Sequence, residues 1–162
     1  TVLSDAAAPD DLGLIDSNIL VYAFDSSEGE RHLNAKEFLL QRIDGEGAVL
    51  SVQNLAEFYF VCTEKIQHPL DMKTARDAIV NLSNQFNVFM YLPNTIMTAA
   101  IIQQDFKIHF WDALLIATMQ ENHIQTIYTE NEKDFSKIPW LKVINPLKWL
   151  LIFYTGYFFG FE

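Results

Sequence analysis

The 162-residue sequence predicts an α/β fold, a three-layer sandwich in which helices cover both faces of a central parallel sheet of about five strands. Short runs of strand-forming residues alternate along the chain with longer segments whose apolar residues recur at helical spacing. Half of the residues are apolar and a fifth are charged, which is typical of a globular chain long enough to bury one core. We therefore expect a single α/β domain.

The strand-like runs are short enough for buried strands, and Gly, Pro, Asn and Asp mark turns between several of the elements. They cover residues 12–16, 48–52, 87–92, 125–129 and 141–144. Because helical segments separate them, the strands are expected to run parallel. A ligand would then bind beyond the carboxyl ends of the strands.

The helical segments are identified by apolar residues three and four positions apart. This spacing predicts helices within 33–43, 55–62 and 75–82. Asn94 is expected to be the N-cap of a further helix over 95–106, and Asp112 is expected at or near the start of another over 113–120.

The net charge of −10 argues against nucleic-acid binding, which depends on Lys and Arg neutralising phosphates. Divalent cations bound by clustered carboxylates would weaken this argument, as would the four lysines near the C-terminus, Lys133, Lys137, Lys142 and Lys148. The single Cys62 cannot form an internal disulfide, and this fits a cytoplasmic protein.

The two ends of the chain differ in composition from the predicted domain over 12–148. Residues 1–11 are expected to form a flexible leader, since they lack the basic and apolar regions of a signal peptide. Residues 149–162 form an aromatic, apolar tail that is shorter than the roughly 20 residues of a membrane span. Two interpretations of the tail stay open: it packs on its own domain, or it forms an apolar patch for a partner or a membrane surface.

Two acids interrupt apolar surroundings in the first half of the chain. Asp16 ends the first strand, where a site would lie, although an N-cap for the following segment explains it equally well. Glu57 lies among bulky apolar residues, so we expect it to be partly buried with a partner. Glu64 lies about two turns further on and is the ordinary solvent-facing comparison.

Two further segments with candidate site residues follow in the second half of the chain. Asp112, considered alone, is best explained as an acid that caps the first turn of a helix. The segment TENEKDF follows the fourth strand and contains Thr129, Asn131 and Asp134, which an ordinary polar loop would also explain.

The order of these four segments along the chain says more about the function than any one segment does. The D-x-N of Asp16 and Asn18, NLAEF around Glu57, WDALLIA around Asp112 and TENEKDF resemble the PIN domain family, most closely the VapC-type toxin ribonucleases. The resemblance runs from about Leu12 to Leu147 and implies a PIN-like sandwich on a parallel sheet. It also implies a metal-dependent endoribonuclease that acts on RNA, a homodimer, and an antitoxin partner that holds the toxin inactive.

Carboxylates that converge without His or Cys form an oxygen site suited to Mg²⁺ or Mn²⁺. A divalent ion between them favours their ionised forms, which explains acids in apolar surroundings. The resemblance implies four residues that are both catalytic and metal-binding: Asp16, Glu57, Asp112 and Asp134. It also implies three residues that orient these ligands or position the phosphate: Asn18, Thr129 and Asn131. Glu130, Asn131 and Glu132 compete with Asp134 for the fourth position, and the family's motif spacing favours Asp134. His109 is interpreted as an ordinary surface histidine.

Other functions stay open at this point. The acidic charge and the aromatic tail are compatible with a non-catalytic PIN-like binding or scaffold module. A PIN nuclease that acts on ribosomal RNA precursors or DNA flaps would share the chemistry and differ in substrate. The sequence has no Ser-His-Asp arrangement, Walker loop or G-x-G-x-x-G, which excludes serine hydrolases, P-loop enzymes and dinucleotide-binding proteins.

Overall fold

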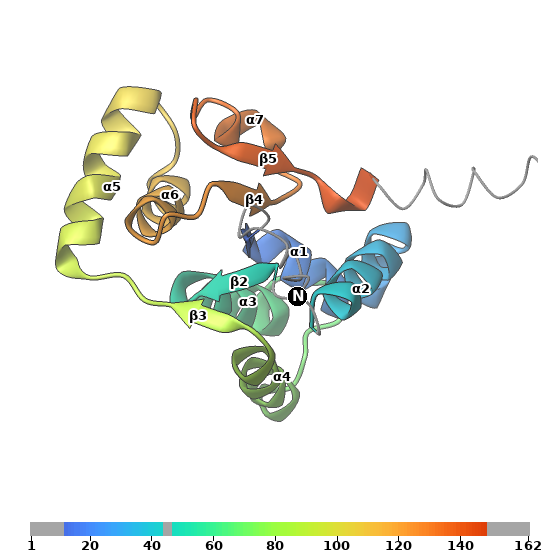
Figure 1. The fold of residues 1–162 in the computed structure, drawn as a ribbon. Helices are drawn as coiled ribbons and strands as arrows, with labels where there is room; N and C mark the ends of the chain where they lie inside the picture. The colour runs from blue at the N-terminus through green and yellow to red at the C-terminus, as the bar shows by residue number, and fades with distance from the viewer. Residues whose placement is uncertain (1–11, 44–46, 149–162) are drawn as a thin grey trace, which may run out of the picture.

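The computed structural model describes residues 12–43 and 47–148, so the predicted leader and tail lie outside the described residues. Five parallel strands form one sheet in the order β3-β2-β1-β4-β5 (Figure 1). The strands are β1 (Gly13–Ile15), β2 (Ala48–Ser51), β3 (Asn87–Phe89), β4 (Thr126–Tyr128) and β5 (Lys142–Ile144). All five predicted strands are confirmed.

The helices of the described residues lie on both sides of this sheet. They are α1 (Ser17–Phe24), α2 (Glu30–Ile43), α3 (Val52–Glu64), α4 (Met72–Gln85), α5 (Pro93–Phe106), α6 (Phe110–Glu121) and α7 (Glu132–Phe135), with short 3₁₀ turns at Ser26–Glu28 and Pro146–Lys148. Alternate residues of a strand point to opposite faces. Ile15 and Leu50 accordingly pack in the core beneath α1 to α4, whereas Leu14 and Val49 pack in the core beneath α5, α6 and α7. The three-layer sandwich is therefore confirmed.

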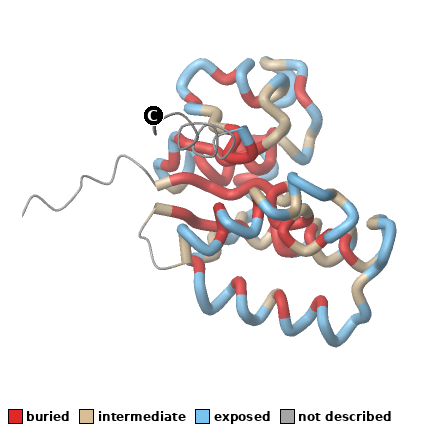
Figure 2. The backbone as a smooth tube through the Cα atoms, turned by 90° about the vertical axis from the view of Figure 1, so that its right-hand side faces the viewer, coloured by how far each residue is buried: buried red, intermediate tan, exposed pale blue. Residues whose placement is uncertain are grey.

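The central strands β1, β2 and β4 are buried throughout, and the edge strands β3 and β5 are partly exposed. Figure 2 shows this pattern as a buried sheet between helices whose outer sides are exposed. Gly13 makes room for a buried ring from the neighbouring strand, because a Cβ there would lie 2.3 Å from Cε2 of Tyr128. Tyr128 in turn packs against Phe38 and beneath the guanidinium of Arg42.

The start of α5 corrects one expectation from the sequence. Asn94 is not the N-cap: the helix begins at Pro93 and its N-cap is Leu92. Proline suits a first helical position, because its φ is fixed near the helical value and it needs no partner for an N–H. The Leu92 N–H donates instead to Thr95 Oγ1 at 2.9 Å. Within 12–43 and 47–148, every helix is too short or too polar to cross a membrane.

Candidate active site

The sheet brings two of the predicted site residues together at a topological switch point. The chain winds from β1 through β2 to β3 in one direction, and β4 and β5 lie on the other side of β1. Ligands bind at such a point, beyond the carboxyl ends of the strands. Asp16 follows β1 and Thr129 follows β4, and the Asp16 N–H donates to the Tyr128 carbonyl at 2.9 Å. The two side chains therefore emerge next to each other.

Asp16 is a helix cap whose second carboxylate oxygen binds Thr129, another of the predicted site residues. Its Oδ1 accepts from the Ser17 N–H at 2.7 Å, which makes it the N-cap of α1, and its Oδ2 accepts from Thr129 Oγ1 at 2.7 Å. Burial above all, and the charges of Glu57 and Asp112, raise the pKa of Asp16 to about 6, although the hydrogen bond from Thr129 lowers it. The capping interpretation is confirmed, but it does not explain why other acids gather around this carboxylate.

Glu57 is half-buried on α3, as expected, and both of its oxygens have partners. Oε2 accepts from Ser17 Oγ at 2.5 Å and Oε1 accepts from Gln53 Nε2 at 2.8 Å. Glu64, on the same helix, is exposed, as predicted. The sequence interpretation missed the roles of Ser17 and Gln53. The only local signals for them are that Ser17 adjoins Asp16, and that Gln53 precedes Glu57 by one helical turn.

Asp112 lies in the first turn of α6, where the helix dipole favours a negative charge. The N-cap is His109, and no hydrogen bond reaches the Asp112 carboxylate from the residues that the structure describes. The interpretation of Asp112 as a hydrogen-bonding cap is therefore wrong. Burial raises the pKa of this half-buried acid, the charges of Asp134 and Glu57 raise it further, and the neighbouring His109 acts in the opposite direction. Asp112 is thus an acid without a structural hydrogen bond in a negatively charged neighbourhood.

The acids after β4 have different surroundings. Glu130 accepts a hydrogen bond from Tyr22 and pairs with Arg31 Nε at 3.1 Å. Glu132 pairs with Lys148 at 2.5 Å. These two competitors for the fourth position are therefore engaged with cations.

Asp134 lies near enough to Asp112 for its charge to raise the pKa of that acid. Its own pKa is lowered by Lys137, whose Nζ lies 2.8 Å from Asp134 Oδ1. Asn131 Nδ2 donates to Oδ2 at 3.5 Å, at the limit of a hydrogen bond. This proximity to Asp112 supports Asp134 over Glu130 and Glu132 as the fourth acid, which stays a prediction.

Thr129 connects the remaining predicted residues. Its fully buried hydroxyl donates to Asp16 and accepts from Asn18 Nδ2 at 3.2 Å and from the Asn131 N–H at 2.9 Å. These contacts fix the orientation of the Asp16 carboxylate. Asn18 Oδ1 is buried and has no hydrogen-bond partner within the described part of the chain. Such an oxygen is available to a cation or to a donor on a ligand.

The donor set fits a hard divalent cation by its chemistry. It consists of carboxylates whose charges raise the pKa of Asp16 and of Asp112, with the unpartnered amide oxygen of Asn18 nearby. As the side chains lie, no three His, Cys, Asp or Glu residues of the described ranges are close enough together to hold a metal ion. Binding by three or more of these acids therefore requires their side chains to turn toward a common point.

The raised pKa of Asp16 predicts how the stability of the metal-free protein depends on pH. Folding raises this pKa from 3.8 to about 6, so the folded state holds the proton more tightly than the unfolded chain. The resulting stabilisation is complete below the unfolded pKa and is lost as the pH rises through the folded one. We expect wild type to lose about 2–3 kcal/mol relative to Asp16→Asn as the pH rises from 4 to 7.

Urea unfolding of both proteins in EDTA, at steps across this pH range, measures that difference. The Asn side chain does not titrate, so the other acids cancel in the comparison. A difference between the two proteins that is constant with pH would show that Asp16 does not titrate in this range.

Residues 13–141, well over half of the chain, match the family model of the PIN domain. No curated protein matches the sequence significantly. Several solved structures have the same fold. A toxin–antitoxin complex from Klebsiella pneumoniae matches at 25% identity with a TM-score of 0.60, covering 83% of this chain and 97% of that one.

VapBC2 from Rickettsia felis, solved with a promoter DNA fragment, matches at 16% identity with a TM-score of 0.61, covering 83% of this chain and 98% of that one. VapC20 of Mycobacterium tuberculosis, a Sarcin-Ricin loop cleaving toxin, matches at 18% identity with a TM-score of 0.60. The match covers 76% of this chain and 92% of that one. The chain therefore belongs to the PIN domain family, and its fold within that family is that of the VapC-type toxins.

Proposed function

We propose that this protein is a Mg²⁺- or Mn²⁺-dependent endoribonuclease, the toxin of a toxin–antitoxin pair. One observation carries the proposal: Glu57 of α3 and Asp112 of α6 lie close enough to the buried Asp16, at the switch point of the sheet, for their charges to raise its pKa. Their mutual repulsion costs stability unless a cation offsets it. Membership of the PIN domain family supports a nuclease.

In this proposal Asp16, Glu57, Asp112 and Asp134 hold the ion. A divalent ion supplies positive charge that favours deprotonation of the attacking water and stabilises the leaving oxygen of a phosphodiester. Thr129 holds the Asp16 carboxylate in place by its hydrogen bond, and Asn18 and Asn131 orient the Thr129 hydroxyl.

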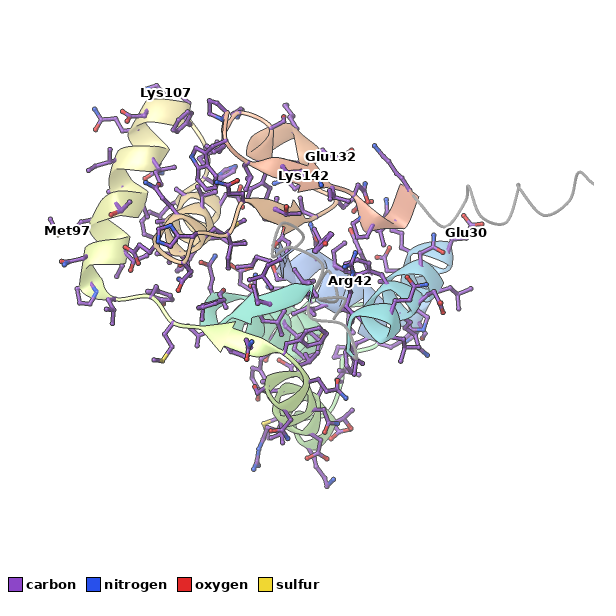
Figure 3. All side chains as sticks on the ribbon, viewed as in Figure 1. Glu30, Arg42, Met97, Lys107, Glu132 and Lys142 are labelled. Carbon is purple, nitrogen blue, oxygen red and sulfur yellow. The ribbon has the colours of Figure 1, made fainter. Side chains whose placement is uncertain are left out.

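The proposal extends to two protein partners. The toxin–antitoxin complexes among the similar structures support an antitoxin that inhibits this chain in the cytoplasm. Exposed apolar side chains on α5 support a homodimer, since Met97 and Ile101 are 68% and 61% exposed and Ile96 is 43% exposed. Figure 3 shows Met97 pointing away from the body of the molecule.

Cleavage of nucleic acid by matched variants tests the activity. Metal-depleted protein is given a mixed RNA or a DNA flap, with and without Mn²⁺, and Glu57→Gln is compared with Glu64→Gln. We expect RNA cleavage only with metal, a loss of about 100-fold or more in Glu57→Gln, and wild-type activity in the exposed Glu64→Gln. Cleavage of the flap alone would replace the proposed substrate. Folded wild-type protein that cleaves neither substrate would favour a non-catalytic module.

A further inference from the structure

An aromatic groove adjoins the acidic site on the side of Glu57. It has a volume of about 700 Å³, within the usual range of ligand sites. Its aromatic side chains are Phe60 of α3, Tyr91 after β3 and Trp111 of α6. Phe60 and Trp111 are 53% and 59% exposed, which is unusual for such large apolar side chains.

The groove and the acidic site share residues. Glu57 lines the groove, and Trp111 directly precedes Asp112 in the first turn of α6. Gln53, which is almost fully buried and also lines the groove, donates through Nε2 to Glu57 Oε1 and to the Trp111 carbonyl, each at 2.8 Å. Both acceptors require the amide nitrogen, so the amide orientation is determined. Gln53 therefore fixes the aromatic wall relative to the carboxylates.

The charge of the groove limits what can bind there. Among the described residues that line it there is no Lys or Arg, and Glu57 is the only charged one. A nucleic acid held here cannot depend on neutralised phosphates, but aromatic side chains bind bases by stacking, whatever the base. Because the groove opens on Glu57, a strand with its phosphate at the acids has its neighbouring nucleotide within reach of the groove.

We propose that this groove binds one unpaired base of a single-stranded RNA substrate, next to the phosphate that is cleaved, with Trp111 and Phe60 as the stacking surfaces. The inference rests on the proposed ribonuclease function and adds the substrate class. It explains how a chain of net charge −10 can hold RNA. It also predicts that RNA binding depends only weakly on salt, since few counterions are released.

The test uses a short RNA that the wild type cleaves at one bond and the same RNA with an abasic nucleotide beside that bond. If the wild type cleaves nothing, single-stranded oligonucleotides with and without one abasic position are used for binding. Trp111→Ala is compared with Trp111→Phe, which keeps a ring, and with Trp140→Ala, a partly exposed tryptophan outside the groove lining. Phe60→Leu keeps an apolar side chain but removes the ring, and it replaces Trp111→Ala as the test variant if that protein does not fold. Fluorescence anisotropy of an end-labelled RNA in EDTA measures binding without cleavage and does not depend on the tryptophan that is substituted.

We expect Trp111→Ala to raise KM about tenfold or more with a smaller change in kcat, and Trp111→Phe to restore most of the loss. Removing the base should raise KM for the wild type but not further for Trp111→Ala. Trp140→Ala should behave as the wild type. In EDTA, Trp111→Ala should bind RNA more weakly than the wild type, and Trp111→Phe and Trp140→Ala should bind it nearly as well.

The outcomes separate this inference from the proposed function. Cleavage by the wild type with equal KM for Trp111→Ala would overturn the base-binding groove and leave the ribonuclease intact. Trp111-dependent RNA binding without cleavage would support the groove and contradict the ribonuclease. A variant that loses only self-association or antitoxin binding would identify a protein surface and overturn the inference. Absence of both binding and cleavage in the wild type would overturn both.

Discussion

Asp112→Asn is expected to lower kcat/KM for metal-dependent RNA cleavage by about 100-fold or more, while the metal-free protein stays as stable as the wild type or becomes more stable. The carboxylate accepts no hydrogen bond from the described residues, so the main favourable effect of its charge on folding is that of the α6 dipole, worth about 1 kcal/mol or less. Burial and the nearby Asp134 and Glu57 raise its pKa, so that charge is unfavourable without a cation. Cleavage assays with Mn²⁺ measure kcat/KM, and melting curves in EDTA measure the stability of the metal-free protein.

The matched control for Asp112→Asn is Asp77→Asn on α4. Asp77 is exposed and forms a surface ion pair with Lys73 at 2.7 Å, an interaction worth less than about 1 kcal/mol. The same chemical change there should leave cleavage intact. If Asp112→Asn were destabilised in EDTA by several kcal/mol, its carboxylate would have a structural role that the contacts do not show.

Thr129→Val is expected to have the largest effect on stability, a loss of about 2–4 kcal/mol in the free energy of unfolding. Valine has nearly the same shape but lacks the hydroxyl. The buried Asp16 carboxylate then loses a donor, and the Asn131 N–H and the Asn18 amide lose their acceptor. Urea unfolding at neutral pH measures this loss, and cleavage should fall as well because Asp16 loses its orientation.

Thr129→Ser separates the hydroxyl from the volume of the side chain. Serine can restore all three hydrogen bonds and removes only a methyl group, so we expect most of the stability and activity to return. A Thr129→Val protein as stable and active as the wild type would contradict the role of this hydroxyl.

The layers and strands of the fold could be predicted from the sequence because the signal is local. The run 48–52 is apolar except for Ser51, as expected of a strand buried on both faces, and the run 125–129 consists mostly of β-branched and aromatic residues. The strand order could not be predicted, since it depends on contacts between distant segments. The N-cap of α5 was predicted at the wrong residue although Pro93 was a local signal for the correct start.

The candidate site was predicted only in outline. Asp16, Glu57 and Asp112 stood out as acids in apolar surroundings, and the family resemblance assigned them, with Asp134, to one site. The contacts that organise them join residues far apart in sequence, such as Ser17 with Glu57 and Gln53 with the Trp111 carbonyl. Helix periodicity indicates which face of a helix is buried, but not which side chain meets which across the fold.

Titration of the metal-free protein with Mn²⁺, followed by calorimetry and by the melting temperature, tests the central claim that these acids hold a divalent cation. The account predicts saturable binding that raises the melting temperature of the wild type, and much weaker binding by Asp112→Asn. Folded wild-type protein that takes up no Mn²⁺, or an Asp112→Asn variant that binds it as tightly as the wild type, would contradict the account.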